Sequence, residues 1–154
     1  MGIWGLGAFE NDDAADWVAE FRGSPTLQQL DDAFEAVLAQ GGYLEIPECA
    51  SAVAAASLLA QALELAKDEE VLDQDEMQAL RVELANMSLE ALQDLVRRAE
   101  RTLSVAATDR DRSELFQVWH DEGEDGAAAW TANIEKLAAD LRRATDRWWN
   151  TPQA

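Results

Sequence analysis

Five carboxylate side chains form the clearest candidate for chemistry in this sequence. Asp12, Asp13 and Asp16 fall within about one helical turn, and Glu45 and Glu48 stand close together further along the chain. Carboxylate oxygens are the ligands that Mg²⁺, Ca²⁺ and Mn²⁺ prefer, and paired carboxylates also serve as acid and base. If both segments begin helices that lie side by side, they would form a pocket for a hard cation or an acid and base pair.

A structural role explains the same carboxylates. Asp12, Asp13 and Glu48 fall in expected first helical turns, where anions are stabilised by the helix dipole. Their spacing is also not that of an EF-hand or a known hydrolase motif. We therefore expect no cofactor, and the alternative hypothesis is a metal-binding domain or metal-dependent hydrolase that uses Asp12, Asp13, Glu45 and Glu48.

The chain contains one histidine and one cysteine. His120 is the only histidine, which excludes a HExxH zinc site, and we expect it at the surface or at a helix C-terminus. Cys49 is the only cysteine, so no intrachain disulfide is possible, and its apolar surroundings in sequence predict a buried thiol. Neither a GxxxxGK[ST] loop nor GxGxxG after a strand is present. We predict no catalytic residue.

The segment before Asp12 combines glycines with large aromatic residues. Trp4 and Phe9 lie among glycines that include Gly5 and Gly7, so the backbone is free to lay two large rings against another surface. We interpret residues 1–11 as an anchor segment whose rings fill holes between helices.

A helix is predicted to begin directly after this segment. Asn11 is a good N-cap residue and precedes two aspartates. An apolar stripe follows at helical spacing and must pack on other elements. The stripe consists of Ala14, Trp17, Val18 and Phe21.

These opening residues also carry a family resemblance. The pattern WG.G.F.NDDAADW from Trp4 to Trp17 resembles the DUF4259 family of small bacterial proteins of unassigned function, although Ala8 stands where proline is expected. Three further stretches agree with that family: YLEIPECASAVAAA (43–56), SELFQVW (113–119) and AAWTANIEKLAADLRR (128–143). The resemblance implies a helical domain and brings no activity, substrate or catalytic residue.

The charge excludes some partners. The formal net charge is −19, whereas the net charge of a small soluble domain typically has a magnitude of about 2 to 8. Arg22 is the only basic residue up to Gln61, and we expect arginines to balance the second half. Such a field repels nucleic acid and anionic membranes and attracts basic proteins. Solubility or adaptation to high salt would explain the charge without a partner.

The rest of the chain predicts a single all-α domain, 1–154, with six or seven helices. The central helix is expected at 48–67, where small alanines allow close approach of its neighbours. Ser24 and Pro25 are predicted to open the second helix, and Ser88 a later one. The last helix is expected to reach about Thr145.

A tail is predicted at 148–154. Its Trp148 and Trp149 would need tethering, either on the domain or on a second subunit, so an accessory dimerisation domain is a further hypothesis. No stretch resembles a membrane span or signal peptide, which predicts a cytoplasmic protein. Our leading hypothesis is a non-enzymatic acidic binding protein, in an immunity-like or adaptor role, with a basic protein partner.

Overall fold

The computed structural model describes residues 7–65 and 71–149, giving only the backbone for 145–149, and these residues form seven helices. The helices are α1 (Asp12–Gly23), α2 (Leu27–Leu38), α3 (Ile46–Ala62), α4 (Gln74–Ala85), α5 (Leu89–Ala106), α6 (Glu114–Asp121) and α7 (Glu124–Trp149). The described ranges contain no strand, so the predicted all-α class is confirmed. None of the described helices has the length and apolar character needed to cross a membrane.

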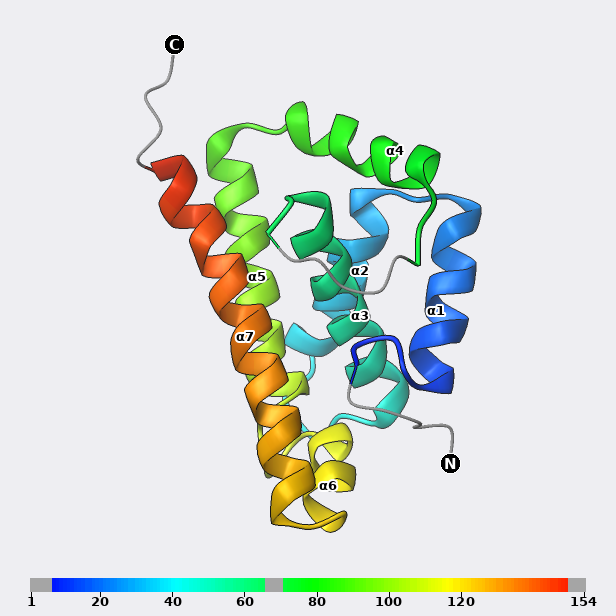
Figure 1. The fold of residues 1–154 in the computed structure, drawn as a ribbon, viewed down its shortest axis with the longest axis vertical. Coiled ribbons are helices and arrows are strands. Elements are labelled where there is room, and N and C mark those ends of the chain that lie inside the picture. The colour runs from blue at the N-terminus through cyan, green and yellow to red at the C-terminus, as the bar shows by residue number, and fades with distance from the viewer. Residues whose placement is uncertain (1–6, 66–70, 150–154) are drawn as a thin grey trace.

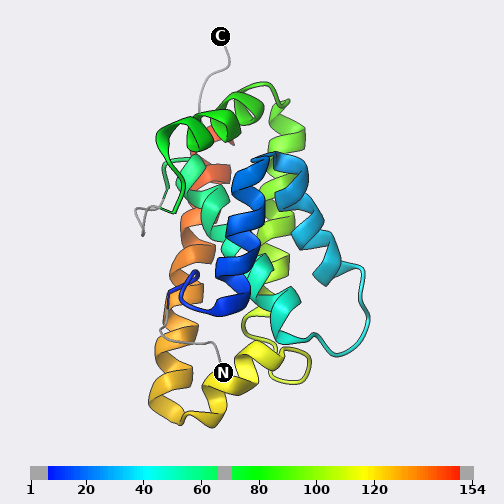
Figure 2. The same cartoon turned by 90° about the vertical axis from the view of Figure 1, so that its right-hand side faces the viewer.

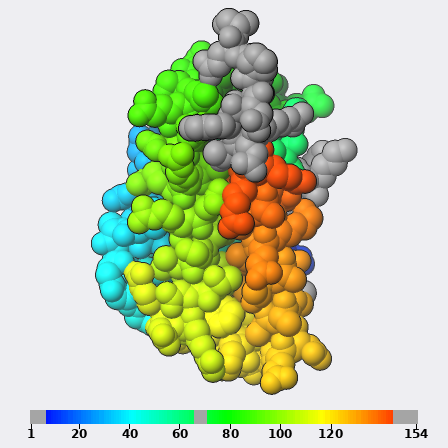
Figure 3. All heavy atoms as spheres, turned by 90° about the vertical axis from the view of Figure 1, so that its left-hand side faces the viewer, coloured from blue at the N-terminus to red at the C-terminus, as the bar shows by residue number. Residues whose placement is uncertain are grey.

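Helix α3 lies at the centre of the bundle. Helices α1 and α7 run in the same direction as α3, and α2 and α5 run in the opposite direction (Figures 1 and 2). Helix α4 crosses the end of the bundle where α3 finishes, whereas α6 lies near the end where α3 begins. Figure 3 shows α5 and α7 side by side along one face. We call the two ends the α4 end and the α6 end.

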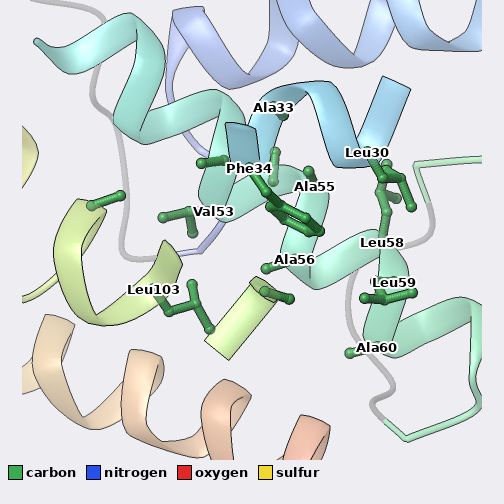
Figure 4. Close-up of a cluster of buried hydrophobic side chains, with 14 of the residues drawn as sticks. Leu30, Ala33, Phe34, Val53, Ala55, Ala56, Leu58, Leu59, Ala60 and Leu103 are labelled. Carbon is green, nitrogen blue, oxygen red and sulfur yellow. The ribbon is translucent and has the colours of Figure 1, made fainter. Parts of the chain in front are cut away.

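The composition of α3 explains its position. Thirteen of its seventeen residues are buried, and most of these are alanines, whose small side chains let neighbouring helices approach closely. Phe34 of α2 reaches across to Ala55 and Ala56 of α3 (Figure 4). The predicted alanine-rich core helix is confirmed, and its polar residues Ser57 and Gln61 are buried as well.

Most helix starts follow sequence signals, with one correction. Asn11 and Ser88 are N-caps, as predicted, and their side chains accept hydrogen bonds from backbone N–H groups. The prediction that Ser24 caps α2 is wrong, because Thr26 accepts from the N–H of Gln29 instead. Ser24 ends α1, where its own N–H donates to the carbonyl of Phe21.

Two predicted helix ends also need correction. Helix α3 extends over Ile46–Ala62, so it begins earlier than expected and ends five residues before Lys67, which lies outside the described residues. Helix α7 continues to Trp149, beyond the expected end near Thr145 and into the predicted tail. The side chains of Trp148 and Trp149 lie outside the description.

Candidate functional site

The start of α1 is a buried cap with acidic residues beside it. Asn11 has an extended backbone (φ −153°), is only 4% exposed, and its Oδ1 accepts from the N–H of Ala14 at 2.7 Å. Asp12 and Asp13 follow in the first turn, where they lie at the positive end of the α1 dipole.

The aromatic residues of this region belong to the apolar core. Phe9 is buried in that core, and Trp17 packs against it while stacking on Phe21 with 5.1 Å between ring centroids. Gly7 donates from its N–H to Oε1 of Glu10 at 3.0 Å, and a Cβ added at Gly7 would lie 2.5 Å from that oxygen. Any other residue at this position would therefore displace the carboxylate. Residues 1–6 of the predicted anchor, which include Trp4 and Gly5, lie outside the described residues.

The carboxylates singled out from the sequence do share one end of the molecule. Helices α1 and α3 both begin at the α6 end (Figures 1 and 2). Glu45 occupies the N-cap position of α3 without a capping hydrogen bond, and Glu48 lies in the first turn, where its Oε2 is buried and has no hydrogen-bond partner. Within the described residues, however, no three His, Cys, Asp or Glu side chains form a group that could hold a metal ion. The structure does not assemble three of Asp12, Asp13, Glu45 and Glu48 into such a site.

A hydrogen-bonded contact at this end was not predicted from the sequence. The N–H of Leu44 donates to the carbonyl of Arg112 at 2.7 Å, and the N–H of Glu114 donates to the carbonyl of Leu44 at 3.0 Å. These bonds form an isolated parallel bridge between Leu44 and Ser113. Nε of Arg112 also donates to the carbonyl of Gly42 at 3.0 Å. We call this contact the main-chain junction.

Buried polar groups complete the main-chain junction. Ser113 is the N-cap of α6: its Oγ accepts from the N–H of Phe116 at 3.1 Å and donates to the carbonyl of Ala106. The thiol of Cys49 lies 3.8 Å from the carbonyl of Leu44 and 3.7 Å from Oγ of Ser113. The junction therefore joins the residues before α3 to the start of α6, and both hydrogen-bonding functions of the α6 N-cap hydroxyl have partners.

The environment of Cys49 opposes nucleophilic chemistry. Burial raises the pKa of its thiol above the ordinary value, so the thiol stays protonated near neutral pH. The only histidine in the chain, His120, is exposed in the last turn of α6 and its Nε2 lies 3.3 Å from the guanidinium of Arg110. The predicted buried thiol is confirmed, and the surface position of His120 is confirmed too.

Charge is distributed differently from the prediction. Residues 1–61 hold ten carboxylates and one arginine, but residues 62–154 hold twenty-one carboxylates against eleven basic residues. The expectation that arginines balance the second half is therefore wrong, because both parts carry a similar acidic excess.

Helix α1 carries an exposed row of carboxylates with no ion pair among the described residues. Asp12, Asp16 and Glu20 are exposed at four-residue spacing, which places them on one face of α1. We call these three side chains the acidic row. On α2, by contrast, both Asp31 and Glu35 pair with Arg98, at 2.8 and 2.7 Å.

Comparison with known proteins identifies the family. A family model described as a domain of unknown function, DUF4259, matches residues 2–133. The chain belongs to the DUF4259 family. No curated protein and no solved structure matches it. The DUF4259 match covers α1 to α6 and includes the acidic row and the main-chain junction, but it assigns no activity to either.

Proposed function

We propose that this DUF4259 protein is a non-enzymatic binding protein that recognises a basic protein through the acidic row of α1. The observation that supports the proposal is that Asp12, Asp16 and Glu20 are exposed together without ion pairs among the described residues. Basic side chains of a partner would complement such a row and would be steered toward it. An immunity-like or adaptor role would use this kind of recognition.

Folding alone explains the acidic row poorly. Asp12 lies in the first turn of α1, where a negative charge is favourable, but Glu20 lies in the last turn, where it is unfavourable. Like charges four residues apart also destabilise a helix, by about 0.2 to 0.5 kcal/mol for each pair. The row therefore lowers the stability of α1, and a binding role accounts for this where a structural role does not.

A capture experiment with a matched control tests the proposal. The immobilised full-length protein is compared with the variant Asp12→Asn, Asp16→Asn, Glu20→Gln and with the control variant Asp111→Asn, Glu122→Gln, Glu135→Gln. The control removes three charges from exposed positions outside α1. We expect the wild type and the control to retain the same basic proteins from a lysate of the source cell at about 0.05 M salt and to lose them at about 0.5 M.

The α1 variant should retain those proteins at least about tenfold less well, because three charge-assisted contacts are lost. Circular dichroism melts of all three proteins establish that each is folded. Equal capture by the α1 variant and the control, or capture that does not respond to salt, would contradict recognition through the acidic row.

A further inference from the structure

Helix α4 contributes little to the apolar core. Two of its twelve residues, Leu80 and Leu84, are buried, whereas α3 of the same bundle buries thirteen of seventeen. Val82 on its outer side is 49% exposed. Its position across the end of the bundle, seen at the top of Figure 1, therefore depends strongly on polar contacts.

Those polar contacts are made to the ends of other helices. Oε2 of Glu83 accepts from the N–H of Leu27, the first residue of α2, at 2.9 Å. The guanidinium of Arg81 donates to the last carbonyls of α3, at 3.3 Å to Gln61 and 3.1 Å to Ala62.

These two contacts supply charges that α2 and α3 lack. Helix α2 has no acidic residue in its first turn, and α3 has no basic residue in its last turn. The carboxylate of Glu83 and the guanidinium of Arg81 complement those dipoles from α4 and satisfy backbone groups that have no partner within their own helices.

A third contact joins α4 to α1. Nε of Arg22, in the last turn of α1, lies 2.9 Å from Oε1 of Glu76. Glu76 also accepts from the N–H of Asp73 and completes the capping box that begins α4. Three charged side chains of α4 therefore hold it to the ends of three helices.

We propose that α4 is a strap that opens as a unit while the rest of the bundle stays folded. Segments with few buried apolar contacts open at a lower free energy than the core, and contacts between charged side chains and helix ends are individually weak. Opening removes Arg81 from the end of α3 and Glu83 from the start of α2, so it uncovers both helix ends without disturbing the main-chain junction.

Amide hydrogen exchange of the full-length protein at neutral pH tests this strap. We expect amides of α4 to exchange at least about tenfold faster than amides of α3 and α5, because local opening exposes them. In the variant Glu76→Gln, Arg81→Gln, Glu83→Gln the α4 amides should exchange about tenfold faster again, while α3 and α5 change by less than about twofold.

A control variant has the same change in charge. Arg101→Gln, Glu122→Gln, Glu135→Gln also removes two carboxylates and one arginine, at exposed positions outside α4. It should leave α4 exchange unchanged. Equal protection of α4 and α5 in the wild type, or an equal acceleration of both helices in the α4 variant, would overturn the proposal.

If the triple variant does not fold, Glu83→Gln alone decides. It keeps an acceptor for the N–H of Leu27 and loses the charge, so α4 should exchange about two- to fivefold faster. An unchanged rate would again overturn the proposal.

Discussion

Charged side chains bond to backbone groups at both ends of the bundle, but among the described residues a backbone bridge closes the α6 end alone. At the α6 end, the main-chain junction pairs Leu44 with Ser113 through backbone hydrogen bonds and buries the cap of α6. At the α4 end, Arg81 and Glu83 close the bundle with charged side chains that reach helix termini. Backbone pairing in a buried site is costly to break, whereas side-chain contacts to helix ends are weak and sensitive to charge. The main-chain junction should therefore open only with the whole protein.

The largest expected effect comes from shortening a buried leucine at each end. Leu44→Ala should lower the free energy of unfolding by about 2 to 5 kcal/mol, because a fully buried side chain leaves a cavity. Leu84→Ala makes the same change on α4. If α4 opens separately, a substitution on α4 can lower the free energy of unfolding by no more than the free energy of opening α4. The loss for Leu84→Ala should therefore be smaller than the loss for Leu44→Ala. Urea unfolding of both variants measures the difference, and equal costs would remove the distinction between the two ends.

The capping serines give a smaller version of the same test. Ser113→Ala should cost about 1 to 3 kcal/mol, since the variant loses a cap and leaves the buried carbonyl of Ala106 without its donor. Ser88 caps α5 next to α4 but is exposed, so Ser88→Ala should cost only about 1 kcal/mol. Thermal melts compare the two variants. A larger loss for Ser88→Ala would mean that the cap at the α4 end is the more important one.

Contacts between residues close in sequence could be predicted, whereas contacts between distant segments could not. The N-caps Asn11 and Ser88 were predictable because a cap bonds to an N–H only three residues away. The pairing of Leu44 with Ser113 was not, because it depends on how distant segments pack. Local signals also failed at Ser24, where two helix ends compete: its N–H closes α1, and Thr26 opens α2.

The candidate site was predictable only in part. The sequence shows which carboxylates the chain carries, but their ion pairs depend on distant arginines. Asp31 and Asp16 are both helical aspartates, yet Asp31 forms an ion pair with Arg98 because α2 packs against α5. The sequence alone therefore does not distinguish the carboxylates of the acidic row from the ion-paired carboxylates of α2.

A modest stabilisation is expected at the α4 end from a change in backbone freedom. Glu64 follows α3 with φ 59°, and the N–H of Leu65 donates to the carbonyl of Ala60 at 2.9 Å, an arrangement that favours glycine. Glu64→Gly should raise the free energy of unfolding by about 0.5 to 1 kcal/mol. The exposed pair of Glu64 with Arg81, at 3.9 Å, offsets little of this. Glu64→Ala should not stabilise, and an equal gain for both variants in urea unfolding would exclude the backbone as the cause.

The smallest expected effect separates folding from binding in the acidic row. Glu20→Gln removes a negative charge from the last turn of α1 and its repulsion with Asp16, so it should stabilise the protein by at least about 0.3 kcal/mol. Asp12→Asn removes a favourable charge from the first turn and should destabilise the protein slightly, because relief of the repulsion with Asp16 offsets part of the loss. Thermal melts at low ionic strength detect the opposite signs, and added salt should reduce both. A loss of stability in Glu20→Gln would show that this carboxylate serves folding at the α4 end. The argument that the acidic row lowers the stability of α1 would then fail for Glu20, and the proposed recognition of a basic protein would rest on the exposure of the row alone.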